Sequence, residues 1–299
     1  MLDMLPDALS SRPLAMADAG AVFRVMAADE LVSLGEVSIE EADIVSDWQR
    51  PSFDVGASTI GVFDGDDLIG YAEVGPAGRG DACVHPQQLG RGIGTHLAGW
   101  MQDTAREQGQ TEIGMPVPAG SPGERLMRDL GYRVRWNSWV LQLPQGATIA
   151  ARPLPAGFAI RAGRPEDYRA VWTVVEDAFL EWSVRERQTF EDFAATIYER
   201  PGFEPWNMRV LTDDRDEIVG TSIVSMNLPT AYVSRLAVRR DLRGRGLAQA
   251  LLADSFAVGR EHGATVSELS TDSRTGALSL YEKVGMVVTS NWVNLGIEV

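Results

Sequence analysis

AVRRDLRGRGLAQALLADS, residues 237–255, places two glycines around an arginine, between an apolar strand pattern and a long helical pattern. A second copy of the arrangement, CVHPQQLGRGIGTHLAGWM, occupies residues 83–101. The spacing of 154 residues that separates Gly92 from Gly246 also separates the glycine of RDLGYRV from the glycine of EKVGMVV. Chance does not keep such a register, so we interpret the chain as a duplication.

A length of 299 residues is typical of about two domains. Three prolines and two glycines with little periodicity fill residues 143–158, which are typical of a linker. We therefore expect an N-terminal domain at 1–146, a linker at 147–157 and a C-terminal domain at 158–299.

Each half predicts the same order of strands and helices, so the expected fold class is α/β: two tandem domains, each with a mixed central sheet flanked by helices. In the first half we expect, in order, strands at 58–64 and 67–75, a helix at 92–109, a strand at 111–117, a helix at 123–131 and a strand at 132–143. In the second half we expect strands at 158–163, 208–214, 217–227, 231–238, 265–272 and 287–299, and helices at 164–182, 190–200, 246–263 and 275–285.

The turn at residues 243–248 predicts an anion site. Glycines let the backbone approach a ligand, and the first N–H groups of the following helix have no partner within that helix. Such an end suits a diphosphate, to which Arg243 and Arg245 can add charge-assisted contacts. A dinucleotide fingerprint fails because Gln249 stands where a third Gly or Ala is needed, and a Gly-Lys-Ser/Thr phosphate loop is absent.

Composition excludes several classes of protein. A net charge of −15 and a pI near 4.7 disfavour general binding to nucleic acid or to anionic membranes. One cysteine and three scattered histidines give no disulfide and no metal-ligand spacing. Neither a secretory signal nor an apolar run long enough to span a bilayer is present, so we expect a cytoplasmic protein.

The turn resembles that of the GNAT superfamily of N-acetyltransferases, Arg/Gln-x-x-Gly-x-Gly/Ala. Arg243, Gly246 and Ala248 match it, whereas Leu89 stands at the first position in the first half. GALSLYEKVGM, residues 276–286, is similar to the last helix of the family. Two such domains in one chain resemble most the tandem acyltransferases that include mycothiol synthase.

The resemblance implies acetyl-CoA as the acyl donor, held in a slot between two splayed parallel strands, 231–238 and 265–272. The strand edge would bind the pantetheine amides, and a backbone N–H there would stabilise the oxyanion. The implied cofactor residues are Leu236, Ala237, Val238, Arg243, Gly244, Arg245, Gly246, Leu247 and Ala248, with Cys83, Val84, Gly90, Arg91, Gly92, Ile93 and Gly94 in the first half.

Tyr281 is the catalytic residue that the resemblance implies, as the acid that protonates the departing thiolate. Alignment on the glycines that close the last helices puts Met127 opposite it. We therefore expect the second domain to be catalytic and the first to be a degenerate copy, which either still holds acetyl-CoA or only supports the fold.

The general base stays open. Many relatives place a glutamate where this chain has Tyr232, and no carboxylate lies between Tyr232 and Val238. Glu181, Glu204 and Glu268 are candidates through a water relay, and an acceptor that arrives as a neutral amine needs no strong base.

Four aromatic residues are either core or the lining of an acceptor pocket: Trp182, Trp206, Tyr198 and Phe203. Cys83 is interpreted as a small core residue and not as a nucleophile, because only His85 offers a basic neighbour in sequence.

The resemblance implies acetyl transfer to an amine by direct attack in a ternary complex. We expect the acceptor to be the primary amine of a small molecule and the protein to be a monomer or homodimer. Two alternatives remain: a peptide or protein N-acetyltransferase, and a CoA-binding sensor without turnover.

Overall fold

The two halves of the chain have nearly the same order of strands and helices, as the repeated pattern predicts. The computed structural model describes residues 5–6, 8–150 and 152–299 and divides the chain into two units. Unit 1 comprises residues 1–138 and 290–299, and unit 2 comprises residues 139–289. None of the helices in the described residues has the length and apolar character needed to cross a membrane.

The elements of the first half are β1 (Leu9–Arg12), α1 (Ala19–Ser33), α2 (Glu41–Trp48), α3 (Val55–Ser58), β2 (Thr59–Asp64), β3 (Asp67–Gly75), β4 (Arg79–Val84), α4 (Ile93–Glu107), β5 (Glu112–Pro118), α5 (Pro122–Asp129) and β6 (Arg133–Gln142). Those of the second half are β7 (Ala159–Ala162), α6 (Tyr168–Phe179), α7 (Phe190–Ile197), β8 (Met208–Thr212), β9 (Ile218–Asn227), β10 (Thr230–Val238), α8 (Leu247–Glu261), β11 (Val266–Asp272), α9 (Leu278–Lys283) and β12 (Val287–Glu298). The predicted α/β class is confirmed.

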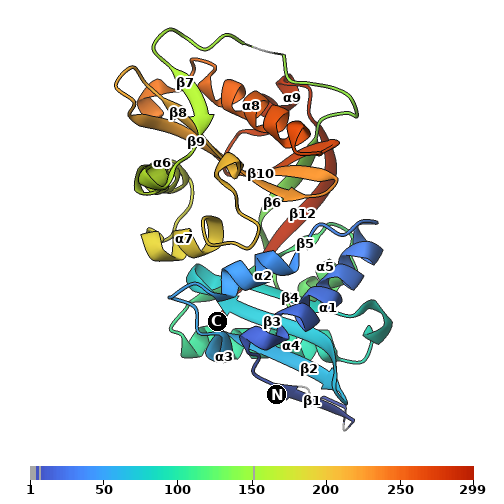
Figure 1. Ribbon diagram of the computed structural model, residues 1–299. Helices are drawn as coiled ribbons and strands as arrows, with labels where there is room; N and C mark the ends of the chain where they lie inside the picture. Colours follow the sequence, from blue (N-terminus) through green and yellow to red (C-terminus); the bar gives the residue numbers. More distant parts are fainter. Residues whose placement is uncertain (1–4, 7, 151) are drawn as a thin grey trace. The chain divides into compact units, whose positions relative to one another are not determined.

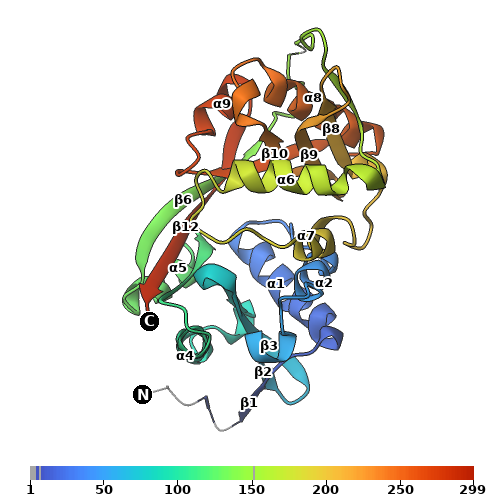
Figure 2. The same ribbon diagram turned by 90° about the vertical axis from the view of Figure 1, so that its left-hand side faces the viewer.

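Unit 1 is a sheet between two helical layers, with strand order β1-β2-β3-β4-β5-β12. Side chains of a strand point alternately to its two faces, so one set packs on α4 and the other on α1 and α2. Val62 and Leu97 belong to the core on the α4 side, whereas Tyr71 and Trp48 belong to the core under α1 and α2. Figure 2 shows α4 on the opposite side of β2 and β3 from α1 and α2.

Unit 2 repeats this arrangement, with strand order β6-β11-β10-β9-β8-β7. Helix α8 packs on one face through Leu252 and Phe256, next to Val233 of β10. Helices α6 and α7 pack on the other face, where Val171 and Phe193 join Ile223 of β9. Figure 1 shows α6 and α8 on opposite sides of β9 and β10.

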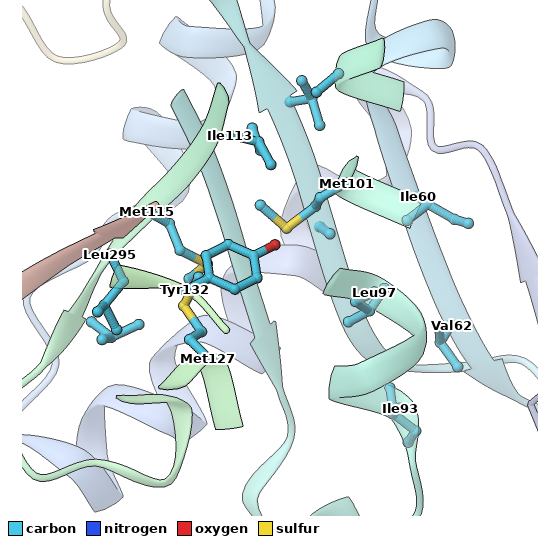
Figure 3. Packing of buried hydrophobic residues seen from close by; sticks show 14 of the residues in the cluster. Ile60, Val62, Ile93, Leu97, Met101, Ile113, Met115, Met127, Tyr132 and Leu295 are labelled. Carbon is cyan, nitrogen blue, oxygen red and sulfur yellow. The ribbon is translucent and has the colours of Figure 1, made fainter. Parts of the chain in front are cut away.

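The boundaries of the units differ from the predicted ones because the last strand of each half contributes to the unit of the other. Residues 292–298 of β12 pair antiparallel with β5, and Leu295, which is 0% exposed, joins the core of unit 1 (Figure 3). The end of β6 lies beside β11, where the N–H of Leu143 donates to the carbonyl of Ser267 at 3.0 Å. The predicted linker, 147–157, falls inside unit 2, and its Ile149 is buried in that core.

Candidate functional site

The turn between β10 and α8 leaves the first amides of the helix without a side-chain partner. The chain makes a short 3-10 helix, Arg240–Leu242, and then enters α8 at Leu247. Gly244 and Gly246 have φ values of +76° and +81°, in the left-handed region that favours glycine. No side chain in the described part of the chain caps α8, and a Cβ at Gly244 would meet no described atom within 4 Å. These N–H groups can therefore bind an anion.

The first half has the same backbone device but fewer cationic groups. Gly90 and Gly92 have φ values of +77° and +80°, and α4 begins at the next residue. Leu89, the counterpart of Arg243, is 47% exposed and adds no charge. The guanidinium of Arg91 lies 3.3 Å from a carboxylate oxygen of Asp64. The turn of unit 1 thus offers amides, with weaker electrostatic support.

Four other predicted cofactor residues have structural roles. Ile93 and Leu247, both 1% exposed, anchor the two helices in their cores, so only their backbone can face a ligand. A Cβ at Gly94 would lie 2.7 Å from Leu126 Cδ2, so this glycine allows α4 to approach α5 closely. Ala248 packs at the edge of the core formed by α8 and β9.

The parallel strands β10 and β11 separate, as the resemblance implied. They pair only as far as Val233 and Leu269, although β10 continues to Val238. The N–H of Arg239 donates to the carbonyl of Val219 on β9 at 2.9 Å. Because backbone groups of successive residues point to opposite edges of a strand, those of Leu236 and Val238 face the edge that β11 leaves open.

The strands β4 and β5 of unit 1 separate even earlier, since only Arg79 and Gly114 are paired. The N–H of His85 donates to the carbonyl of Ile69, which matches the contact of Arg239 in unit 2. By the same alternation, Val84 faces the open edge and Cys83 faces β3.

Arg243 is held at the turn by two contacts. Its Nε donates to the carbonyl oxygen of Val238 at 3.0 Å, and its two terminal nitrogens each donate at 2.8 Å to one oxygen of Glu181. This guanidinium lowers the pKa of Glu181 below its usual value. Glu181 therefore orients an arginine of the turn, which makes it a poor proton acceptor.

A cation that the sequence did not reveal lies at the same turn. Arg152 Cδ and Nη1 would be 3.8 and 3.9 Å from a Cβ placed on Gly246. Nearby, Gln249 Nε2 donates to the carbonyl of Ala150 at 3.4 Å, so the segment predicted as a linker runs along the start of α8. Only proximity in space brings Arg152 here, and no sequence motif marks it.

Tyr281 lies on α9 and packs against the core that contains Val233 and Phe256. Burial raises the pKa of Tyr281 to about 12, and the neighbouring Tyr232 adds to the rise. The phenol therefore keeps its proton at physiological pH and is available as a donor. Its counterpart Met127 is 5% exposed and packs beside Tyr132 and Met115 (Figure 3).

The two remaining candidate bases differ in their surroundings. Glu204 Oε2 accepts from the indole of Trp206 at 2.9 Å, and that indole stacks on His262 with ring centres 3.8 Å apart. Glu268 pairs with Tyr232 in the β10–β11 register, where the two strands part, and its Oε2 accepts from Gln142 Nε2 at 2.7 Å. Of these two carboxylates, Glu268 is the one that lies beside Tyr232 at the point where β10 and β11 part.

The four aromatic residues predicted as either core or pocket lining also differ in their surroundings. Tyr198 and Phe203 pack with Tyr168 at the edge of the core under α6 and α7, and Tyr198 stacks on Tyr168 with ring centres 3.7 Å apart. Trp182 lies under the guanidinium of Arg274, 4.9 Å from its carbon. Tyr198 and Phe203 therefore have a structural role.

Cys83 has the environment of a structural residue. Burial raises the pKa of its thiol well above the usual range, and the charge of Asp81 adds to this effect. On the same strand, burial raises the pKa of Asp81 to about 7, helped by Glu73 on the paired strand. Glu73 itself accepts from the indole of Trp48 at 3.1 Å and from the phenol of Tyr71 at 2.5 Å.

Asp81 predicts a pH-dependent stability. Its pKa is higher in the folded protein than the value of about 3.9 in an unfolded chain, so the charged form opposes folding above pH 7 and this penalty disappears as the pH falls toward 4. We expect Asp81→Asn to raise the melting temperature at pH 8 and to have little effect at pH 4.5. Asp66→Asn, at an exposed hairpin position, is the control. An equal effect of Asp81→Asn at both pH values would contradict the assignment.

Known proteins match both halves of the chain, in agreement with the duplication. The model of the Acetyltransferase (GNAT) family matches residues 25–132 and 168–286, once in each half. The mycothiol acetyltransferase of Salinispora arenicola is 30% identical over 247 residues, which cover 76% of this chain and 77% of that protein. The mycothiol acetyltransferase of Sanguibacter keddieii is 28% identical over 298 residues, which cover 93% of this chain and 92% of that protein.

Solved structures agree. A GCN5-related N-acetyltransferase from Sphaerobacter thermophilus superposes with a TM-score of 0.75 at 29% identity, covering 99% of this chain and 97% of that chain. A tandem GNAT protein from the clavulanic acid biosynthesis pathway shares the fold, with a TM-score of 0.74 at 19% identity and coverage of 97% and 98%. These matches confirm the family resemblance: the chain belongs to the acetyltransferase (GNAT) family, whose members use an acyl-CoA donor, and it is an N-acetyltransferase with two tandem domains of this fold.

Proposed function

We propose that unit 2 transfers an acetyl group from acetyl-CoA to the primary amine of a small molecule. One observation carries this proposal: the open edge of β10 ends directly at a turn whose helix amides have no side-chain cap among the described residues. A strand edge and an anion site in succession suit a donor whose pantetheine amides are followed by a diphosphate.

The residues at this place fit acetyl-CoA. A Cβ on Gly244 would meet no described atom within 4 Å, and one on Gly246 would meet Arg152 at 3.8 Å, while Arg243 and Arg245 supply positive charge. The backbone groups of Leu236 and the N–H of Val238 face the open edge, where they can bind the pantetheine amides as an added strand would; the carbonyl of Val238 accepts from Arg243 Nε. An N–H of this edge also stabilises the charge that develops on the thioester oxygen.

Tyr281 supplies the proton for the departing sulfur. The acceptor nitrogen attacks the acetyl carbon directly, so donor and acceptor must be bound together. The proton stays on Tyr281 until the carbon–sulfur bond breaks, because its pKa of about 12 keeps the phenol neutral. A non-polar environment also raises the pKa of the leaving thiol above its usual value of about 8.5. This brings the pKa of the thiol closer to that of the Tyr281 phenol, which gives it the proton.

Unit 1 is proposed to be catalytically silent. Its turn has the same φ values, so it can still hold acetyl-CoA. It lacks a proton donor at Met127 and an arginine at Leu89, so a bound donor there would not be turned over.

A small-molecule acceptor is supported by the relatives, which are named for acetyl transfer involving mycothiol. The negative net charge of the chain also favours a cationic acceptor. The amine side of the site is formed by the face of β10 that α6 and α7 cover.

The test is release of CoA thiol from acetyl-CoA with a panel of amines, for example glucosamine, cysteine amide, putrescine and a lysine-containing peptide. Turnover with one of the small amines supports the proposal. Preference for the peptide would favour a protein N-acetyltransferase. Tight binding of acetyl-CoA in calorimetry without turnover of any amine would favour a sensor.

Arg243 gives a prediction about donor binding. A charge-assisted hydrogen bond contributes roughly 1.5–3 kcal/mol. When Arg243 binds the diphosphate it gives up part of its contact with Glu181, so the net contribution to donor binding is smaller. We expect Arg243→Ala to raise the KM for acetyl-CoA about tenfold and to change kcat less. Arg91→Ala, at the turn of unit 1, should leave both constants unchanged. A fall in kcat at constant KM would contradict a role in donor binding.

A further inference from the structure

A row of polar side chains crosses three strands of unit 2 at the point where β10 and β11 part. Tyr232 and Glu268 are register partners one position before the last pair of the ladder. The hydroxyl groups of Tyr232 and Ser270 lie 2.6 Å apart, so a hydrogen bond joins the two strands just before the open slot. On the other side, Glu268 accepts from Gln142 of β6 at 2.7 Å.

This row lies on the face of the sheet that α6 and α7 cover. Ala231 and Val233 point to the opposite face, where they pack in the core with Phe256 of α8. Since side chains alternate along a strand, Tyr232 points away from α8, and its register partner Glu268 points the same way. Tyr281 packs in the α8-side core and belongs to the other side of the slot.

The proton donor for sulfur and a carboxylate thus lie on opposite sides of the proposed thioester position. An amine that attacks the acetyl carbon from the α6 and α7 side approaches Tyr232, Ser270 and Glu268, while the sulfur leaves toward Tyr281. The geometry matches what direct transfer needs, since one group must accept a proton from the amine and another must give one to the sulfur.

The other candidate carboxylates are engaged elsewhere. Both oxygens of Glu181 accept from Arg243 at 2.8 Å at the phosphate turn. Glu204 is bound by Trp206, whose ring stacks on His262 after the end of α8. Glu268 is the candidate that lies beside Tyr232 where β10 and β11 part, and its Oε2 accepts from Gln142.

We infer that Glu268 is the proton acceptor for the amine, with the Tyr232–Ser270 hydroxyl pair positioning the amine beside it; this role rests on the proposed function. The ammonium gives one proton to the Glu268 carboxylate, and its nitrogen forms the bond to the acetyl carbon. The carbon–sulfur bond breaks, the electron pair leaves with sulfur, and sulfur takes the Tyr281 proton. The second proton of the nitrogen restores the phenol, and Glu268 releases its proton to water.

The experiment compares wild type and Glu268→Gln with acetyl-CoA and the most active amine of the panel, at pH 7 and at a pH above the pKa of that amine. At pH 7 we expect kcat to fall about 100-fold, in the range that loss of a general base produces. At the higher pH the amine arrives neutral, so the defect should shrink to a few-fold. A purely structural role would leave the same defect at both pH values and would overturn the assignment.

Two further variants make the result specific. Glu261→Gln, at an exposed position of α8, is the matched control and should behave as wild type. Tyr232→Phe should lower kcat/KM about fivefold to tenfold through a higher KM for the amine, because it removes a positioning hydroxyl and keeps the ring. A Glu268→Gln variant within threefold of wild type at pH 7 would overturn the role of Glu268 alone.

Failure of the underlying function gives a different pattern. A wild type that binds acetyl-CoA in calorimetry but acetylates none of the amines would overturn the proposed function, and with it the role of Glu268. Binding of acetyl-CoA should be equal in wild type and Glu268→Gln, since the carboxylate lies on the acceptor side.

Discussion

Replacement of Tyr281 by phenylalanine is expected to lower kcat for acetyl transfer by about 100-fold to 1,000-fold at pH 7.5. The substitution keeps the ring that packs on the core around Val233 and removes only the hydroxyl group. General acid catalysis contributes roughly 10² to 10⁴ in rate. Because the hydroxyl group acts on the departing sulfur and not on the diphosphate, the dissociation constant for acetyl-CoA should change less than threefold.

Tyr132→Phe is the matched control for this variant. It also removes a buried phenol, one that accepts a hydrogen bond from Gln102 at 3.4 Å, but it lies in unit 1. We expect it to leave kcat unchanged. A Tyr281→Phe enzyme that retains a third or more of wild-type kcat would remove Tyr281 from the mechanism, and a large effect of Tyr132→Phe would point to unit 1.

The elements nearest the donor site could be predicted from sequence because their determinants are local. Gly246 is needed at a φ of +81°, and an apolar period of helical spacing follows it directly. The same local logic applies to Gly92 and to the strands that precede both turns. The parallel pair that separates after Val233 came from the family resemblance and not from any periodicity, and the structure confirms it.

Two parts of the fold could not be predicted, for different physical reasons. Helix α1 buries Val22 and Val25 but leaves Leu31 and Val32 at 58% and 70% exposed, so its apolar residues do not mark one face. The exchange of the last strands depends on pairing between β12 and β5, which are more than 160 residues apart in the chain. Alternating patterns indicate a strand but do not identify its partner.

The residues on the proposed acceptor side could not be predicted from the sequence either, since they come together only in the folded chain. Glu268 stood among three carboxylates of equal standing until the β10–β11 register put it beside Tyr232. Arg152 belonged to a segment that its prolines and glycines mark as a linker, yet it lies at the turn before α8. In both cases tertiary contact assigns the position, and the local sequence carries no signal for it.

The duplication supplies a matched pair of variants that separates the two turns. Gly246→Val and Gly92→Val each put a β-branched side chain at a φ of about +80°, a strain of roughly 1–3 kcal/mol. The nearest atom to a Cβ on Gly246 is Arg152 Cδ at 3.8 Å, and a Cβ on Gly92 meets no described atom within 4 Å. Both variants should therefore fold, with similar losses in melting temperature.

Their effects on function should differ widely. In Gly246→Val the side chain fills the space where the diphosphate would contact the first amides of α8, so we expect kcat/KM for acetyl-CoA to fall at least 100-fold. Gly92→Val should keep kcat/KM within threefold of wild type. Calorimetry also gives the number of acetyl-CoA molecules bound per chain. If unit 1 holds acetyl-CoA, Gly92→Val reduces this number from two to one without loss of activity. If both wild type and Gly92→Val bind one molecule, the turn of unit 1 only supports the fold. The reverse pattern would be an inactive Gly92→Val and an active Gly246→Val, and it would place catalysis in unit 1. The equivalent of Tyr281 there is Met127, which has no proton to give, so this result would overturn the assignment of Tyr281 as the acid.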